Sequence, residues 1–442
     1  MTKLLFAISC LVTALGLWAG YVYLRRSSEE KALRAARAAA ARGELSLAEA
    51  ALGQLADDGI FPNNVRARLA LASVRLAQGD KAKARALACQ LPDDPAADVL
   101  RQLIELPPVT EGGWLDAYLH AWRAAGGRDL RESWLLYDDV DGIDPTRPID
   151  LEQARPVLSR DDAFLVAYAD AIRDQNFVGD VDGSVPPPDA LLRDAEALIG
   201  STDDVVVRLV ALSVLSSPTL PGSEQTRLRP VVVGTWRSLR DAEPENAYFA
   251  LHAFLSATTA FTPVELAQLE EVCRSTTRYD WKLSETYTVA KRALSLVDAP
   301  QAPDAAWSVA TSAGTPPFLG LQARAEDTLR SEPQQARRLG ELFLCLGERA
   351  ATSSVLLDIN VAARLFERAA EWTGDDTVAA RRDAQVSLAS GIVSRWSGPS
   401  PLLLEHWPIA SLRREVHDRI AADELGFFAR LDEGTLAQGP AR

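Results

Sequence analysis

The chain has 442 residues, of which 47% are hydrophobic, and its formal net charge at pH 7 is −14. This length allows two or three domains or one long array of repeats. Cations outnumber anions before residue 43, which leaves a charge of −19 on residues 43–442. An acidic body of this kind argues against nucleic-acid binding.

The first elements of the chain are an apolar segment and a basic flank. Residues 4–24 contain no charge, and the run stops at Arg25-Arg26. A helix needs about 20 such residues to cross a bilayer, and this run exceeds the apolar core of a signal peptide. We therefore expect one retained transmembrane helix. The residues expected to form the anchor and its flank are Leu4, Leu11, Leu17, Trp18, Tyr21, Leu24, Arg25 and Arg26.

The charges around this segment predict its orientation. Most nearby cations follow the span, between residues 25 and 37, and cations beside a span favour the cytoplasm. We expect a single-pass inner-membrane protein with its N-terminus outside and its body in the cytoplasm, and a periplasmic body is the alternative. A face of small residues is compatible with pairing to another transmembrane helix. This face consists of Ser9, Thr13, Gly16 and Gly20.

Two units after the flank share one pattern. Gly43 precedes Ala48 by five residues, and Gly79 precedes Ala84 by the same spacing, 36 residues later. Each Gly is expected to end a helix, and each Ala lets the next helix pack closely on it. This pattern resembles the tetratricopeptide repeat, whose period is near 34 residues. Ala32 and Arg68 stand where that family carries a large aromatic residue.

The resemblance implies stacked antiparallel helix pairs, and it covers residues 29–92. The layout of the whole chain is similar to bacterial inner-membrane proteins with one N-terminal span, an arginine pair and cytoplasmic tetratricopeptide repeats. We therefore expect an all-α fold, an α-solenoid of helix pairs preceded by one transmembrane helix. A third, weaker unit runs over residues 244–269.

Apolar residues recur at helical spacing along the remaining chain. The strongest amphipathic segments are 319–329, 336–350 and 355–372, whereas residues 205–207 and 231–233 are the best strand candidates. The expected organisation has four parts: 1–26 as anchor and flank, 27–106 as repeats, 107–300 as irregular helical pairs with Asp/Pro loops, and 301–442 as a C-terminal helical block.

Few residues have the spacing that metal binding or catalysis requires. A D-V-D-G string occurs at 139–142 and again at 180–183, but each lacks end ligands of a calcium loop, so solvated turns are expected. The four cysteines (Cys10, Cys89, Cys273 and Cys345) include no CxxC, so neither a zinc ribbon nor a disulfide framework is indicated. They suit a reducing compartment and small core positions. The four histidines (His120, His252, His406 and His417) lack metal-ligand spacing. We therefore expect neither a metal nor a cofactor.

One helix face carries three aromatic residues, and this stripe has two interpretations. Trp114, Tyr118 and Trp122 recur every fourth residue and share a helix face. Such a stripe packs between helices or lines a peptide-binding groove.

These patterns together predict a non-enzymatic scaffold or adaptor at the inner membrane. Its expected partners are proteins or peptide segments, membrane lipid and another transmembrane helix. Neither nucleic acid nor a small-molecule substrate is expected. The alternatives are an envelope assembly factor that faces the periplasm and a hydrolase that uses Glu405-His406 or the Asp loops.

Overall fold

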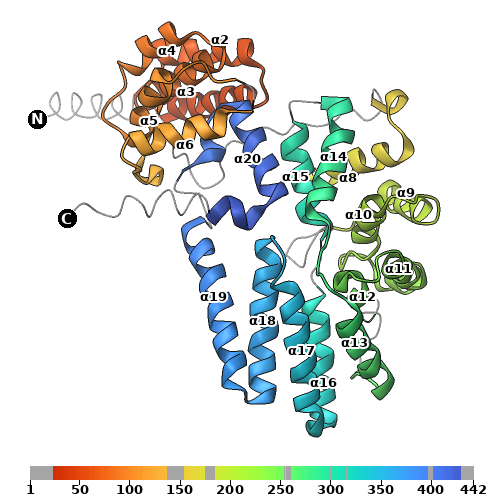
Figure 1. Ribbon diagram of the computed structural model, residues 1–442. Helices are drawn as coiled ribbons and strands as arrows, with labels where there is room; N and C mark the ends of the chain where they lie inside the picture. The colour runs from red at the N-terminus through yellow and green to blue at the C-terminus, as the bar shows by residue number, and fades with distance from the viewer. Residues whose placement is uncertain are drawn as a thin grey trace, which may run out of the picture. The chain divides into compact units, whose positions relative to one another are not determined.

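The computed structural model describes residues 23–110, 112–136, 154–174, 185–252, 254, 260–298, 301–314, 317–396 and 402–429. These residues form helices joined by turns and irregular segments and no strand, and one isolated bridge joins Asn246 to Arg278 (Figure 1). The expected all-α class is therefore confirmed. Both strand candidates are helical, because they continue the apolar faces of α10 (Val205–Leu215) and α11 (Gly222–Ala242).

The predicted transmembrane segment lies outside the described residues, together with its small-residue face. Within residues 23–429 as described, no helix is long and apolar enough to span a bilayer. The anchor therefore stays a prediction from sequence.

The chain divides into two compact units. Unit 1 comprises Met1–Thr146 and Gly398–Val416, and unit 2 comprises Arg147–Ser397 and His417–Arg442. Residues of the predicted C-terminal block, 301–442, thus contribute to both units.

Unit 1 consists of short helices that pack on their neighbours in sequence. After a helix over residues 23–41 come α2 (Leu45–Asp58), α3 (Asn63–Ala77), α4 (Lys81–Ala88), α5 (Pro95–Glu105), α6 (Trp114–Ala124) and η1 (Leu130–Glu132). Near the end of the chain, η4 (Leu404–His406) and the first residues of α20 (Ala410–Ala422) complete the unit.

The turns at Gly43 and Gly79 have the same conformation. Both glycines have φ +83°, the left-handed region that glycine enters without steric cost. In each turn the glycine N–H donates three residues back, to Ala40 or Leu76, and the following N–H donates five residues back. This is the Schellman pattern that satisfies the last carbonyls of a helix. Ala48 and Ala84 are fully buried, as the close helix packing requires.

A distant segment closes the core of unit 1. The Tyr118 hydroxyl donates to the Leu402 carbonyl at 2.5 Å, and its ring meets Trp407 edge-on at 5.3 Å. Glu415 accepts from the N–H groups of Trp114 and Leu115 at 3.1 and 2.8 Å, and thereby caps α6. Residues 402–416 are therefore part of the unit that begins the chain.

Unit 2 contains more and longer helices. They are η2 (Arg155–Val157), α8 (Arg160–Asp174), α9 (Asp189–Ile199), α10, α11, α12 (Ala247–His252), α13 (Pro263–Ser275), α14 (Leu283–Asp298), α15 (Ala302–Ala313), α16 (Phe318–Ser331), η3 (Pro333–Gln335), α17 (Ala336–Ala350), α18 (Leu356–Thr373), α19 (Asp376–Trp396) and the end of α20.

The last helices of unit 2 follow the predicted amphipathic segments closely. The segment 336–350 coincides with α17, and 319–329 and 355–372 fall within a few residues of α16 and α18. α17 packs on α18 and α18 on α19, and the three lie side by side in Figure 1. Their apolar faces join one core with those of α8 to α15.

Local chemistry sets several helix ends in unit 2. Thr262 and Glu265 form a reciprocal capping box at the start of α13. Glu265 also pairs with the buried Arg324 of α16 at 2.7 Å. At the other end of the unit, Gly374 ends α18 in the left-handed conformation.

Candidate functional site

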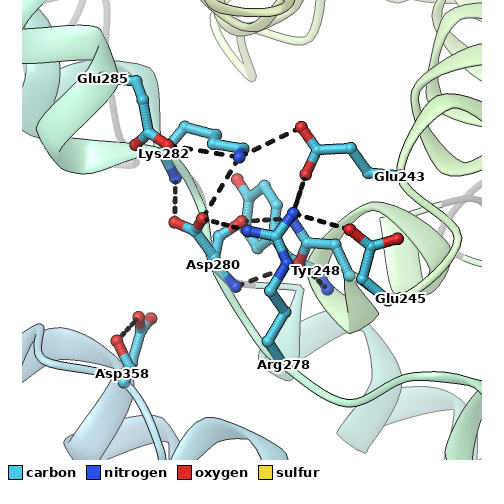
Figure 2. A network of polar contacts seen from close by, with 10 residues as sticks. Glu243, Glu245, Tyr248, Arg278, Asp280, Lys282, Glu285 and Asp358 are labelled. Carbon is cyan, nitrogen blue, oxygen red and sulfur yellow. Dashed lines mark hydrogen bonds and ion pairs between the residues drawn. The ribbon is translucent and has the colours of Figure 1, made fainter.

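A group of charged side chains in unit 2 surrounds Arg278 and Lys282 (Figure 2). Arg278 pairs with Glu243 at 2.5 Å and with Glu245 and Asp280 at 3.1 Å each. Lys282 lies 3.1 Å from Glu243 and 3.4 Å from both Asp280 and Glu285. We call these six residues the Arg278 network.

The backbone places these side chains together. The turn between α11 and α12 runs alongside the linker that enters α14, and Ala247 N–H donates to the Arg278 carbonyl at 2.8 Å. Asn246, which is fully buried, donates to the Asp280 carbonyl at 2.8 Å and accepts from the Asp280 N–H at 3.1 Å. One buried amide therefore fixes the register of the two segments.

Lys282 occupies an unusual backbone position. Its φ is +67°, a region that costs a side-chain-bearing residue energy. The Lys282 N–H donates to Asp280 at 2.8 Å, and its carbonyl accepts from Thr286 at the start of α14. Burial acts to lower the pKa of Lys282, but Asp280, Glu243 and Glu285 outweigh it, so the pKa lies above its usual value.

A buried carboxyl lies near the network. Asp358, in the first turn of α18, is 2% exposed and accepts from the Ser353 hydroxyl at 2.5 Å. Burial raises the pKa of Asp358 to about 7, and the charges of Asp280 and Glu424 act in the same direction. Burial also raises the pKa of Glu424, although its carboxylate accepts from the Leu356 N–H at 2.7 Å. Asp358 is therefore a carboxyl that titrates near neutral pH.

The charge balance of the network decides what it can bind. Four carboxylates surround two cations, so neither cation is left to hold a phosphate or another anion. Among the residues that the structure describes, no cluster of His, Cys, Asp and Glu is fit to hold a metal ion. The ion pairs of the network therefore join the turn before α12 to the start of α14.

A second polar group in unit 2 contains His417. Its Nε2 lies 3.0 Å from Asp304 of α15, and its ring is tilted against Trp307 at 5.8 Å. Nδ1 is buried and has no hydrogen-bond partner among the described residues. Next to it in sequence, Asp418 accepts from the Tyr287 hydroxyl at 2.8 Å. No hydroxyl or thiol in the described contacts of His417 supplies the nucleophile that a hydrolase needs.

The other histidines are apart from this group. His252 is buried and stacked on Trp236 at 4.0 Å, whereas His120 is exposed. His406 is 1% exposed, and its carbonyl accepts from Arg37 at 2.7 Å within unit 1. The Glu405 side chain lies outside the described residues, so the Glu405-His406 pair stays a prediction from sequence.

The aromatic stripe is part of the core of unit 1. Trp114, Tyr118 and Trp122 are 8%, 0% and 4% exposed. The Trp122 indole donates to the Arg128 carbonyl at 2.8 Å, and Tyr118 reaches Leu402. Of the two interpretations, packing between helices is the one that these contacts support.

The basic flank is the described part of the predicted anchor. Arg25 pairs with Glu29 at 2.9 Å and donates to the Asp58 carbonyl at 2.6 Å. Arg26 pairs with Glu30 at 3.4 Å, and Leu24 is 69% exposed. Both D-V-D-G strings lie outside the described residues.

Sequence reasoning missed the Arg278 network and the raised pKa of Asp358. Most residues of the network come from the turn before α12 and the linker before α14, which have no periodicity, whereas Asp358 lies in the first turn of α18. The signal that was available was the run of alternating charge at Arg278, Asp280 and Lys282. Comparison of the chain with protein-family models, curated proteins and solved structures found no match.

Proposed function

We propose that this protein is a membrane-anchored helical scaffold that binds protein segments through unit 1. The observation that carries the proposal is the pair of equal turns at Gly43 and Gly79, each followed by a fully buried alanine. Helix pairs that repeat in this way resemble the tetratricopeptide repeat, and stacks of that repeat bind peptide segments and partner helices.

The start of unit 1 supports the anchoring part of the proposal. Residues 23–41 are helical, and Tyr23 and Leu24, the last residues of the predicted span, are 73% and 69% exposed. Exposed apolar and aromatic residues at this place suit the headgroup region of a bilayer. The scaffold would then hold its binding surface close to the inner membrane, on the cytoplasmic side.

Two aromatic residues offer a probe of the binding surface. Phe61, at the turn between α2 and α3, is 67% exposed, and its ring lies 5.6 Å from that of Trp134. Aromatic rings are enriched in protein interfaces. Leu319 in α16 of unit 2 is 76% exposed and serves as the control position.

The test places a photo-crosslinking amino acid at Phe61 or at Leu319 of the full-length protein in native membranes. We expect defined protein adducts from Phe61, and we expect Phe61→Ser, but not Leu319→Ser, to lose the same partners in co-purification. Equal adducts at both positions, with every partner retained by Phe61→Ser, would overturn the assignment to unit 1.

The anchor and its orientation need separate measurements. Deletion of residues 1–22 should move the protein from the membrane pellet to the soluble fraction. A C-terminal phosphatase fusion should be inactive if the body is cytoplasmic. An active fusion would favour the periplasm-facing assembly factor, and a deletion variant that still pellets would contradict the anchor.

A further inference from the structure

Two cysteines that are far apart in sequence meet in unit 2. Cys273 lies on α13 and Cys345 on α17, and the two helices pack together. The Cys273 thiol lies 3.7 Å from the Leu342 carbonyl oxygen. A helical carbonyl points toward the side chains three and four residues later, so this contact brings the Cys273 sulfur beside Cys345. The two thiols are close enough for each to shift the acidity of the other.

The surroundings make the two thiols unequal. Cys273 is 7% exposed in the core, whereas Cys345 is partly exposed at its edge. Arg349, one turn after Cys345, donates to the Cys273 carbonyl at 3.4 Å, and its buried Nε has no hydrogen-bond partner among the described residues. A guanidinium in this position stabilises a thiolate on the accessible sulfur.

The acidities follow the same division. The neighbouring Cys273 thiol lowers the pKa of Cys345, Arg349 adds to this effect, and together they outweigh burial and Glu348. The nearness of Cys345 and burial both raise the pKa of Cys273. The outer sulfur is therefore the more readily deprotonated of the two.

We propose that Cys273 and Cys345 form a redox-active dithiol, which hydroperoxides oxidise to a disulfide that ties α13 to α17.

The reaction takes place in two steps with hydrogen peroxide as oxidant. The Cys345 thiolate attacks one peroxide oxygen, the O–O bond breaks, and hydroxide leaves, which gives a sulfenic acid. The Cys273 sulfur then attacks the Cys345 sulfur, the S–O bond breaks, and the departing oxygen takes up the Cys273 proton as water. Two thiols lose two electrons in total, and the peroxide is reduced to two waters. A dithiol reductant reverses the oxidation by exchange.

The chain contains its own control. Cys89, just after α4 in unit 1, is exposed, and its thiol has no cysteine partner among the described residues. Accessibility alone would therefore favour oxidation of Cys89, whereas the proposed site favours Cys345.

The experiment treats the reduced full-length protein with substoichiometric hydrogen peroxide, blocks free thiols, and maps the peptides by mass spectrometry. We expect a Cys273–Cys345 cross-linked peptide, lighter by two hydrogen atoms and lost after dithiothreitol. We expect Cys345 to react about tenfold faster than Cys89, because the thiolate is the reacting form. Faster oxidation of Cys89 without the cross-link would overturn the proposal.

Two variants separate the roles of the sulfurs. With Cys273→Ala, dimedone should trap a sulfenic acid at Cys345, because the resolving thiol is gone. With Cys345→Ala, dimedone should leave Cys273 unlabelled. Label on Cys273 in the second variant would contradict the assigned roles, and the peptide map of the unaltered chain decides the site even if a variant folds poorly.

Discussion

At the scale of single residues, the environment of Asp358 predicts how the stability of the protein depends on pH. The Asp358 carboxyl stabilises the fold fully only below its unfolded pKa of about 3.8, and this contribution is lost as the pH rises through about 7. Asp358→Asn should remove this dependence. We expect the variant to gain about 1–4 kcal/mol over the unaltered chain between pH 4 and pH 8, measured by urea unfolding at several pH values.

Asp375 provides a control of opposite sign. Hydrogen bonds from the Thr377 hydroxyl and N–H lower the pKa of Asp375, so its contribution is present above the usual pKa and is lost as the pH falls. Asp375→Asn should therefore lose stability relative to the unaltered chain at neutral pH. Parallel pH profiles for the two variants would contradict the assigned environments.

Gly314 is a second residue whose substitution the structure makes costly. A Cβ built there would lie 1.3 Å from Cε3 of the buried Trp281 ring. Gly314→Ala should destabilise unit 2 by about 1–3 kcal/mol and alter the near-UV circular dichroism of tryptophan. Gly234→Ala, inside α11 with open space around its Cβ, should stabilise by about 0.5–1 kcal/mol. Equal melting points for the two variants would refute the predicted clash.

At the scale of the secondary-structure element, the equality of the turns at Gly43 and Gly79 can be measured. Both glycines have φ +83° and open space around them, so alanine at either position carries only the cost of the left-handed conformation. We expect Gly43→Ala and Gly79→Ala each to cost about 1–2 kcal/mol in chemical unfolding. Gly53→Ala, within α2, is the helical control and should not destabilise. A cost at one turn only would show that the turns are not equivalent.

Helices and turns were the elements that the sequence predicted best. The segment 336–350 matched α17 because its leucines and alanines recur at helical spacing without a break. The turns at Gly43 and Gly79 were predicted because glycine has a specific use at a helix end. Local chemistry determined both features, so local reasoning was sufficient.

The candidate site was beyond local reasoning. Arg278 meets Glu243 through a turn 35 residues earlier, and Cys273 meets Cys345 through helices 72 residues apart. Burial raises the pKa of Asp358, and this burial depends on the packed fold. Tertiary packing decided these contacts, and no periodicity in one sequence encodes them.

At the scale of the whole molecule, a residue near the end of the chain stabilises a helix near its beginning. Glu415 caps α6, some 300 residues away, through two backbone N–H groups. Glu415→Ala should cost about 1–2 kcal/mol and speed amide exchange at the start of α6, measured by hydrogen–deuterium exchange. Glu341→Ala removes an exposed pair with Arg337 and should change little. Faster exchange in α6 in the Glu341 variant, or none in the Glu415 variant, would contradict the capping role.

The late segment 402–416 has a consequence for synthesis of the protein. In sequence order, most of unit 2 is an insertion within unit 1. A ribosome delivers the residues of α6 early, but Leu402, Trp407 and Glu415 emerge only after nearly the entire chain has been made. Unit 1 is thus the first to begin, but its core stays open until residues 402–416 are made, and nonsense mutations ahead of codon 402 would leave it open.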